Sequence, residues 1–478
     1  METQGSTRVL SNEALLVALL VAAEGGAGIG VATIGFDWRS PSIVSGREQM
    51  FAAIVAVSLG LLGLAILQGI LARRSLHYCA LGLAAVCLAG LSVAGLTASV
   101  AAEAKFKAVK AKVLDLGQDV RLKDIGGHVI AGYRAKSDIG KLIGNSVVAG
   151  VYITARNVDG RTAREIGAEI AGWQKARLAA GLPPLLVAAD QEGGLVSHLS
   201  PPLKRRPTLA DSIVGTKDRA KRIAIALAYG RAQGAELAAL GVNVNFAPVV
   251  DLNFGVRGGK DVHTRIYRRA IGRDPAFVTE LAGAFCEGLR AAGVMCTLKH
   301  FPGLGRVSGD THVADARLAL PVADLEGSDL MPFAKLGREP NRMTMLSHVR
   351  LTAIDADAPV SLSGKVVTGL LRERWGHTGV LITDDITMRA AYGSSRKRGL
   401  GSTAEAAVRA LNAGVDLVLI SFDSEQVYPV LAALADAYGN GTLGRDQLAN
   451  SRTRLMPMLD RLKNDPATRF PAIAGQGP

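Results

Sequence analysis

Eight short apolar runs, separated by longer stretches of helical composition, constrain the fold of this chain more than any other feature. Continuous apolar runs are typical of strands that are covered on both faces, and residues 163–178, 219–240 and 276–292 have the composition of crossover helices. Eight such units in about 340 residues predict an α/β fold, the TIM (β/α)8 barrel. The runs are residues 128–133, 147–154, 185–190, 244–252, 294–300, 343–348, 380–385 and 417–422.

The first hundred residues lack these runs and contain long uncharged stretches instead. Residues 50–72 and 76–102 hold no Lys, Arg, Asp or Glu, and Arg73 and Arg74 stand between them. Because about 20 apolar residues span a bilayer, we expect a hairpin of two transmembrane helices rather than a buried core hairpin. A third candidate, residues 14–36, contains Glu24. It spans a membrane only if Glu24 is protonated or packed against another helix, and the alternative is an interfacial helix.

Charge divides the chain into two parts. Residues 1–104 have a net charge of −1, so the remainder carries the whole positive excess of this basic chain. We expect a membrane region over 1–104, a linker or amphipathic helix over 105–124, and a barrel domain over 125–478. A basic domain is drawn to anionic lipid or polymer, although scattered Arg on a solvated face is the commoner explanation. Aromatic residues do not alternate with the basic ones, so we expect no nucleic-acid partner.

Positive residues give opposing signals about the orientation in the membrane. Arg73 and Arg74 in the hairpin loop favour a cytoplasmic loop and put the large domain outside the cytoplasm. Four lysines directly after the last apolar run favour the opposite orientation, unless they belong to a helix that lies on the membrane surface. These are Lys105, Lys107, Lys110 and Lys112. We expect the chain to be anchored in a bacterial inner membrane with its large C-terminal domain outside the cytoplasm.

The four cysteines show neither paired spacing nor a metal-type spacing with histidine. They stand at positions 79, 87, 286 and 296. This pattern predicts neither a disulfide framework nor a zinc site. Phosphate loops and dinucleotide fingerprints do not occur in the sequence, so we expect no cofactor and no metal.

The predicted strands end in polar residues. In a TIM barrel the carboxyl ends of the strands form the active-site face. A single carboxylate after a strand is often only a cap or a turn residue, but five polar strand ends at one rim predict a catalytic site. These ends are Asp190-Gln191-Glu192-Gly193-Gly194, Asp251, Lys299-His300, Ser347-His348 and Thr383-Asp384-Asp385.

Two pairs at this rim fit the hydrolysis of a glycosidic bond. A retaining glycosidase needs a nucleophilic carboxylate and a group that first donates and then accepts a proton. Asp384 and Asp385 are adjacent, so in an extended strand their side chains point to opposite faces and one of them faces the barrel mouth. Asp310 and His312 share a face in an extended loop. A carboxylate beside an imidazole holds its tautomer and raises its pKa, which suits acid and base roles.

Five strings, in order along the chain, resemble glycoside hydrolase family 3, and within it the β-N-acetylglucosaminidase branch. The resemblance covers roughly residues 110–465 and implies a TIM barrel that acts as a glycosidase. The strings are Ala155-Arg156-Asn157, Asp190-Gln191-Glu192-Gly193-Gly194, Asn245-Phe246-Ala247-Pro248-Val249-Val250-Asp251, Lys299-His300-Phe301-Pro302-Gly303 and Leu381-Ile382-Thr383-Asp384-Asp385-Ile386-Thr387-Met388.

The resemblance implies a role for each matching residue. Asp384 matches the family's nucleophile, His312 the acid/base residue and Asp310 its partner. The remaining matches imply substrate-binding roles. Asp190, Lys299 and His300 match sugar-hydroxyl ligands, Arg269 matches an arginine that the family usually writes before Ser-Phe-Gly, and His348 matches a Ser-His-Val string. His348 either lines the pocket or is a structural histidine at the rim.

The chain departs from the family pattern at three positions. The family commonly has Arg where Leu195 and His198 stand, and His where Leu304 stands. These are candidate subsite or loop positions, so the departures bear on the leaving group and the sugar. The proposed nucleophile and the Asp310–His312 pair are intact.

The sequence therefore predicts a membrane-anchored, retaining exo-glycosidase. By resemblance it hydrolyses terminal β-linked N-acetylglucosamine from glycans, with cell-wall fragments as substrates and membrane lipid as a partner of the N-terminal helices. Two alternatives remain open. One is a β-glucosidase-like enzyme of the same family, and the other is a catalytically silent, membrane-anchored glycan-binding barrel.

Overall fold

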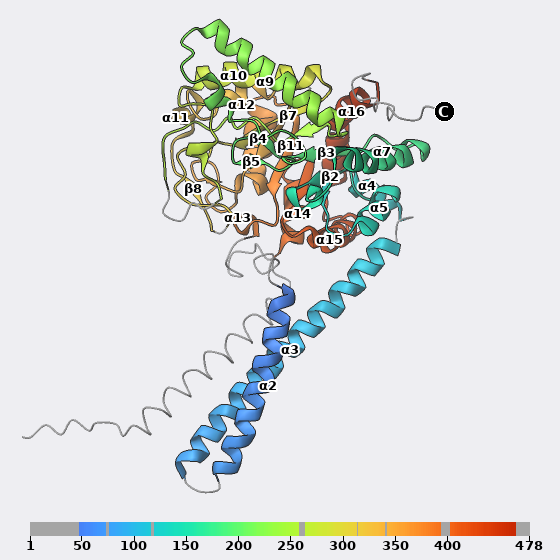
Figure 1. The fold of residues 1–478 in the computed structure, drawn as a ribbon, viewed down its shortest axis with the longest axis vertical. Helices are drawn as coiled ribbons and strands as arrows, with labels where there is room; N and C mark the ends of the chain where they lie inside the picture. Colours follow the sequence, from blue (N-terminus) through green and yellow to red (C-terminus); the bar gives the residue numbers. More distant parts are fainter. Residues whose placement is uncertain are drawn as a thin grey trace, which may run out of the picture. The chain divides into compact units, whose positions relative to one another are not determined.

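The computed structural model describes residues 47–72, 76–115, 119–257, 263–312, 314–339, 342–392 and 402–464. The chain divides into two compact units, with the boundary between Val109 and Lys110. Figure 1 shows the first unit as long helices and the second as a barrel with helices around it. The expected helix over residues 14–36 lies outside the described residues.

Two long helices, α2 (Arg47–Ala72) and α3 (Leu76–Asp115), cover the two uncharged stretches. Ile54 of α2 is buried in a small apolar cluster that includes Leu96 and Ala102 of α3. Among the described residues, Val86–Asp115 is long and apolar enough to cross a membrane, and Gln49–Leu64 is a shorter apolar helix. Residues 105–115, expected in a linker or amphipathic helix, continue α3.

The second unit is built on a closed barrel of eight parallel strands, in the order β1-β12-β11-β9-β7-β6-β3-β2. Each strand coincides with one of the eight apolar runs, which confirms the predicted TIM barrel. The strands are β1 (Val129–Gly132), β2 (Gly150–Ile153), β3 (Leu186–Ala189), β6 (Val244–Asn245), β7 (Met295–Phe301), β9 (Arg342–Leu346), β11 (Val380–Asp385) and β12 (Leu417–Ile420).

Helices surround the barrel, as the crossover pattern predicts. The longer ones are α5 (Lys136–Gly144), α7 (Ala163–Ala179), α9 (Arg219–Ala239), α10 (Pro275–Ala291), the π-helical segment η4 (Lys365–Arg374), α14 (Thr403–Asn412), α15 (Val427–Gly439) and α16 (Arg445–Asn464). The short ones are α4 (Val120–Gly126), α6 (Ala155–Val158), α8 (Leu209–Ile213), α11 (Val322–Glu326), α12 (Met331–Leu336) and α13 (Arg389–Tyr392). Turns of 3-10 helix are η2 (Ile266–Arg268), η3 (Val360–Leu362) and η6 (Ser424–Gln426).

Two small sheets lie beside the barrel. The strands β4 (Gln191–Gly193) and β5 (Val196–Ser197) form an antiparallel hairpin directly after β3. The strands β8 (Arg317–Leu318) and β10 (Arg350–Leu351) pair in parallel. The hairpin folds residues 191–198 back over the end of β3, which places its polar residues at the barrel mouth.

The barrel interior is filled by apolar side chains from alternate strand positions. Phe246, Met295, Met345 and Leu417 belong to one buried cluster, which α16 joins through Leu455. Outside the barrel, α9 and α10 pack closely at Gly230. A larger residue would not fit there, because its Cβ would lie 2.2 Å from the Phe285 carbonyl oxygen. These contacts make a rigid support for the loops at the mouth.

The expectation that the cysteines form no disulfide is wrong for one pair. Cys286 of α10 and Cys296 of β7 form a disulfide with a Cα–Cα distance of 5.4 Å. Both residues are buried. Their ten-residue spacing matches no common framework, but the turn between α10 and β7 brings the helix back against its strand and places the two side chains face to face.

Candidate active site

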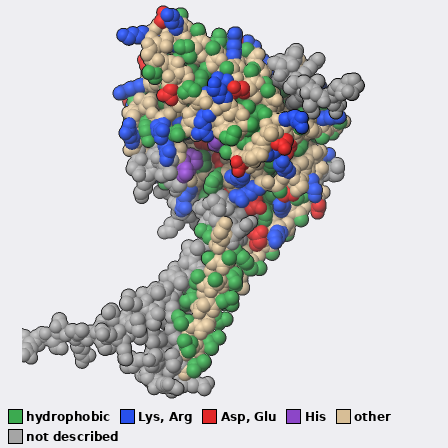
Figure 2. Space-filling model, viewed as in Figure 1, with side chains coloured by type: hydrophobic (Ala, Val, Ile, Leu, Met, Phe, Trp, Pro, Cys, Tyr) green, Lys and Arg blue, Asp and Glu red, His purple; other side chains and the backbone are tan. Residues whose placement is uncertain are grey.

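Polar side chains from five strand ends meet at the carboxyl end of the barrel. Six of the eight residues that the sequence singled out lie in one connected network: Asp190, Arg269, Lys299, His300, Asp310 and His312. Asp384 interacts with this network through its charge, and His348 contacts the backbone of Asp385. On the molecular surface, histidine side chains form a patch on the barrel (Figure 2). Because the barrel is closed and parallel, these strand ends form one face, as the sequence predicted.

Lys299 is the central cation of the network. It lies near the end of β7 with only 2% of its side chain exposed. Its Nζ forms ion pairs with Asp190 and with Glu192 Oε1, the latter at 2.5 Å. Burial alone would raise the pKa of both carboxyls, but Lys299 and its neighbours outweigh burial and hold both pKa values well below their usual range. Both carboxylates are therefore ionised acceptors at neutral pH.

Arg269, which follows η2, approaches the same carboxylate from the other side. Its Nε and Nη2 donate to Glu192 Oε2 and Oε1 at 2.9 and 2.6 Å. Its Nη1 donates to the Thr264 carbonyl oxygen at 2.7 Å. A planar guanidinium held by two parallel bonds has a fixed orientation. Arg269 is thus held in place before any ligand arrives.

His300 is oriented by Asp251, the polar residue after β6. The His300 Nδ1 lies 2.7 Å from Asp251 Oδ2, and the other carboxylate oxygen accepts from the backbone N–H groups of His300 and Leu304 at 3.1 and 2.7 Å. A proton on Nδ1 satisfies the Asp251 contact, and it leaves Nε2 to face Arg269 Nη2 at 3.4 Å. The imidazole is therefore fixed as one tautomer.

Asp384 and Asp385 at the end of β11 have opposite environments. The carboxylate of Asp385 accepts five hydrogen bonds, from the backbone and hydroxyl groups of Thr387 and Ser421 and from the backbone of Phe422. Asp384 accepts one bond that the structure records, from the Asp385 N–H at 2.8 Å. Asp385 therefore binds the neighbouring backbone, and Asp384 keeps a carboxylate oxygen for other chemistry, as alternation along the strand predicts.

The electrostatic environment of Asp384 favours its anion. Burial opposes the charged form, but the nearby imidazoles of His300, His348 and His312 and the hydrogen bond from the Asp385 N–H outweigh it and lower the Asp384 pKa. An ionised carboxylate at the barrel mouth is the form required of a nucleophile.

Asp310 and His312 form a hydrogen-bonded pair in the loop after β7. His312 Nδ1 lies 2.7 Å from Asp310 Oδ1, and Asp310 also accepts from the His263 backbone and the Thr264 hydroxyl at 2.9 and 3.1 Å. Burial alone would lower the His312 pKa, but the Asp310 hydrogen bond and the Asp384 charge outweigh burial and raise it. The His312 side chain is 41% exposed, so its Nε2 has access to a ligand and to solvent.

The loop of this pair is attached to the strand that carries Asp384. Arg389 N donates to the His312 carbonyl oxygen, and Ala390 N donates to that of Thr311, both at 3.2 Å. Arg389 and Ala390 begin α13, which follows β11 after three residues. The carboxylate and the imidazole are thus held at one rim by backbone bonds.

His348 is a buried histidine whose two ring nitrogens are both engaged. Nδ1 lies 2.7 Å from the Ser361 hydroxyl, and Nε2 lies 2.9 Å from the Asp385 carbonyl oxygen. Burial lowers its pKa, so the ring is neutral. Of the two interpretations from the sequence, these contacts favour the structural histidine, one that supports the end of β11.

Four residues of the network were not assigned a catalytic or sugar-binding role from the sequence, although Glu192 and Asp251 stand at polar strand ends and His198 is one of the positions that depart from the family pattern. They are Tyr152, Glu192, His198 and Asp251, whose contacts join β2, the β4–β5 hairpin and β6. Glu192 and Asp251 stand inside quoted strings, so the strings contained a signal for them. Tyr152 lies within an apolar run, and nothing in that run distinguishes it from a core residue.

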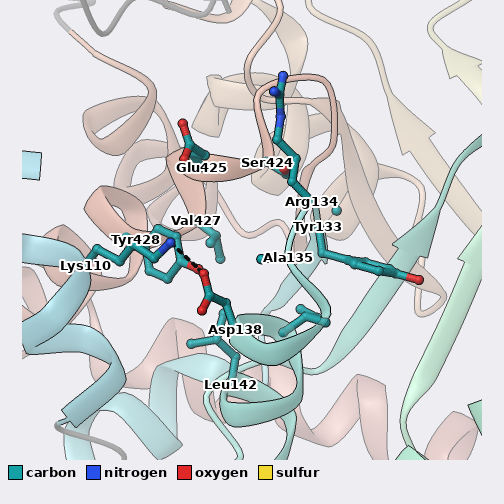
Figure 3. A pocket seen from close by; sticks show the side chains of 12 residues that line it. Lys110, Tyr133, Arg134, Ala135, Asp138, Leu142, Ser424, Glu425, Val427 and Tyr428 are labelled. Carbon is teal, nitrogen blue, oxygen red and sulfur yellow. Dashed lines mark hydrogen bonds and ion pairs between the residues drawn. The ribbon is translucent and has the colours of Figure 1, made fainter. Parts of the chain in front are cut away.

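A separate pocket lies between the loops after β1 and β12 (Figure 3). Asp138 points into it, paired with Lys110 at 2.5 Å and accepting from the Tyr428 hydroxyl at 3.2 Å. These polar groups satisfy one another, so the pocket has no evident reactive group. In the described part of the chain, His, Cys, Asp and Glu side chains form no cluster of three or more that could hold a metal ion.

Comparison with known proteins agrees with this geometry. The model of the glycosyl hydrolase family 3 N-terminal domain matches residues 108–458. A β-hexosaminidase from Nitrosomonas eutropha is 34% identical over 294 residues, which is 61% of this chain and 79% of that protein. A β-hexosaminidase from Xylella fastidiosa is 35% identical over 310 residues, covering 64% of this chain and 86% of that protein.

Solved structures show the same likeness. The β-N-acetylhexosaminidase from Beutenbergia cavernae aligns with a TM-score of 0.61 and 31% identity, over 71% of this chain and 98% of that one. A family 3 β-N-acetylglucosaminidase from a Paenibacillus species aligns with a TM-score of 0.64 and 29% identity, over 74% of this chain and 64% of that one. The family model covers well over half of the sequence and includes every residue of the network, so this chain belongs to glycosyl hydrolase family 3.

Proposed function

We propose that this glycoside hydrolase removes terminal β-linked N-acetylglucosamine from glycans by double displacement, with Asp384 as nucleophile and His312 as acid/base. The observation that carries the proposal is the attachment of the Asp310–His312 loop to the start of α13, close to Asp384. Relatives named β-hexosaminidase and structural neighbours named β-N-acetylglucosaminidase support the choice of sugar.

In the first step, an oxygen of Asp384 attacks the anomeric carbon while the bond to the leaving oxygen breaks. His312 Nε2 donates its proton to that oxygen, because Nδ1 is already engaged by Asp310. The products of this step are a glycosyl ester on Asp384, a free alcohol and a neutral imidazole. In the second step, His312 takes a proton from water, the hydroxide attacks the anomeric carbon and Asp384 leaves as a carboxylate.

The remaining residues of the network bind the sugar. Asp190 offers a carboxylate and Lys299 and Arg269 offer cations. Lys299 is buried, and the side chains of Asp190 and Arg269 are 17% and 9% exposed. Hydrogen bonds between sugar hydroxyls and such ionised groups are about twice as strong as neutral ones. His300, fixed by Asp251, adds one ring nitrogen at the same rim.

We further propose that α2 and α3 anchor the enzyme in a membrane and that the barrel lies on the oxidising side. The described surface of these helices is mainly apolar (Figure 2). Two features support the side: Arg73 and Arg74 in the hairpin loop and the Cys286–Cys296 disulfide, a bond that persists mainly outside the cytosol. Glycan fragments of a bacterial cell wall are available on that side and are the proposed substrates.

The function is tested with the full chain in detergent, by release of nitrophenol from the β-N-acetylglucosaminide and from the β-glucoside. Asp384→Ala is expected to abolish turnover of the first. Asp460→Ala removes an exposed carboxylate from α16 and serves as the matched control, with unchanged turnover.

The outcomes separate the proposed function from its alternatives. Preference for the glucoside would assign a β-glucosidase-like activity. Binding of N-acetylglucosamine without turnover of either substrate, and indifference to Asp384→Ala, would assign a silent glycan-binding barrel.

A further inference from the structure

We propose that His198 is a positioning residue that sets the affinity of the site for its sugar by holding Tyr152 and Asp190 in one hydrogen-bonded chain. The inference rests on the proposed function, because Asp190 is taken as a ligand of the sugar. It concerns a position at which this chain has histidine and the family commonly has arginine.

Three side chains form this hydrogen-bonded chain. The Tyr152 hydroxyl lies 2.5 Å from Asp190 Oδ2 and 3.1 Å from His198 Nδ1. The β4–β5 hairpin places His198 there, since the His198 N–H donates to the Asp190 carbonyl oxygen at 3.0 Å. The same residue therefore contacts Asp190 directly through its backbone and indirectly through its side chain.

The donor in each hydrogen bond of this chain follows from the chemistry of the groups involved. Asp190 is ionised and can only accept, so the single hydroxyl proton of Tyr152 points to Asp190. The Tyr152 oxygen then has only lone pairs to offer to His198, so His198 Nδ1 must carry a proton and donate it. Burial and the nearby carboxylates raise the pKa of Tyr152 far above its usual range, which keeps this hydroxyl protonated.

This chain fixes the rotation of the Asp190 carboxylate. Lys299 pairs with Oδ1 and Tyr152 donates to Oδ2, so each oxygen has one partner and a lone pair that remains for a ligand. The Tyr152 ring is stacked on Phe246 with 5.6 Å between centroids, which restrains the ring but not the rotation of its hydroxyl. His198 supplies the remaining restraint on that hydroxyl.

The chemistry of His198 differs from that of the arginine common in the family. A guanidinium at this position would carry a permanent charge and several donors. An imidazole offers one donor to Tyr152 and adds no permanent charge beside Asp190. We therefore expect the effect of His198 on the sugar to act through the geometry of one hydrogen bond.

The test compares four single variants and the His198→Leu/Tyr152→Phe double variant of the full chain in detergent. His198→Leu removes the donor and keeps a similar volume, and His198→Asn restores a donor close to the position of Nδ1. Tyr152→Phe removes the bridging hydroxyl and keeps the stacked ring. Lys204→Ala changes an exposed side chain after the same hairpin and is the matched control. KM and kcat are measured with nitrophenyl β-N-acetylglucosaminide, and the Kd of free N-acetylglucosamine is measured by calorimetry.

We expect His198→Leu and Tyr152→Phe each to raise KM and Kd by about 3- to 10-fold, which corresponds to the loss of roughly one hydrogen bond. The value of kcat should change much less, because the bond acts equally on bound sugar and transition state. The double variant should be no worse than the worse single variant, because both remove one chain. His198→Asn should stay close to the wild type.

Two results would overturn the inference. Wild-type KM and Kd in His198→Leu would show that the ring does not act on Asp190. Equal losses in His198→Leu and His198→Asn would show that shape, not the donor, is what matters.

If the wild type hydrolyses the acetamido sugar in either case, the proposed function survives and only this inference fails. If the wild type shows no turnover, Kd still decides the role of His198, and absence of both turnover and binding overturns both proposals. If His198→Leu does not fold, Tyr152→Phe and His198→Asn decide alone.

Discussion

Arg269 and Glu192 form a two-bond salt bridge at the mouth of the barrel, with N–O distances of 2.9 and 2.6 Å. Only 9% and 6% of the two side chains are exposed. The residues are 77 positions apart, and Lys299 contacts the same carboxylate. The bridge therefore joins the β4–β5 hairpin, the segment after η2 and β7, so that the ligands proposed for the sugar depend on one another.

We predict that Glu192→Gln lowers the free energy of unfolding by about 3–5 kcal/mol, because it leaves two buried cations short of negative charge. Urea unfolding followed by tryptophan fluorescence measures this. The matched control is Glu280→Gln, which breaks the exposed pair with Arg219 and should cost about 1 kcal/mol or less. Equal losses in the two variants would contradict the prediction.

The pH dependence of stability should differ between the wild type and Glu192→Gln. Arg269 and Lys299 outweigh burial and lower the Glu192 pKa from its ordinary 4.5. A lowered carboxyl pKa contributes stability that is present above pH 4.5 and is lost as pH falls towards the folded value. The wild type should therefore lose more stability between pH 5 and pH 3 than the variant, as thermal unfolding at each pH would show. Parallel curves would argue against the salt bridge as the cause.

Substitution of Asp384 should affect mainly turnover, whereas substitution of its neighbour Asp385 should affect mainly stability. Asp384→Asn should abolish turnover and change stability by less than about 1 kcal/mol, since few groups depend on its charge. Asp385→Asn should cost about 2–4 kcal/mol, because an amide cannot accept all five hydrogen bonds and leaves buried donors unpaired. Thermal unfolding and nitrophenol release on the same preparations measure both. A large loss of stability in Asp384→Asn would reverse our assignment of the pair.

The alkaline limb of kcat/KM should report His312. Burial opposes its charged form, but Asp310 and Asp384 raise the pKa above the ordinary 6.5. Since the first step needs the protonated ring, activity should persist above pH 6.5 and fall as pH passes the raised value. The stability from the Asp310–His312 pair follows the same sign, being present below pH 6.5 and lost above the raised pKa.

Asp310→Asn should move this alkaline limb to lower pH, because the amide oxygen still accepts from Nδ1 but the charge is gone. His312→Ala should lower kcat/KM by about 10²- to 10⁴-fold. Profiles of the three proteins between pH 4 and pH 9 make the comparison. An unmoved limb in Asp310→Asn would assign the titration to another group.

The Cys286–Cys296 disulfide closes a loop of ten residues and should contribute roughly 2–4 kcal/mol. The Cys286→Ala/Cys296→Ala variant should unfold at lower urea, and its stability should not respond to reductant. In membranes from the native host, these two cysteines should resist maleimide labelling after denaturation until reductant is added. Labelling without reductant would place the barrel on the reducing side and contradict the proposed orientation.

The apolar runs predicted the eight strands because parallel strands covered on both faces need continuous apolar sequence. The run 244–252 was longer than its strand, Val244–Asn245, because the residues after Asn245 stay buried but leave the ladder, with one isolated bridge from Val249 to Lys299. Burial and strand pairing are separate properties, and composition reports only the first.

The site was predictable where chemistry is visible in one segment. Adjacent Asp384 and Asp385 and the nearby pair Asp310 and His312 have local spacings that suggest their roles. Tyr152 and the Cys286–Cys296 bond depend on contacts across the fold. Whether Tyr152 meets Asp190, or Cys286 faces β7, is decided by the rotation of one element against another, which a single sequence does not report.

Three of the five hydrogen bonds of Asp385, those from Ser421 and Phe422, join the end of β11 to residues directly after β12, and β12 is the strand that closes the barrel onto β1. Asp384 is therefore held in place only once the last strand has been added. A nascent chain that still lacks β12 carries Asp384, the proposed nucleophile, without the bonds that support the end of β11. Catalytic competence is then expected only at the end of synthesis, together with ring closure.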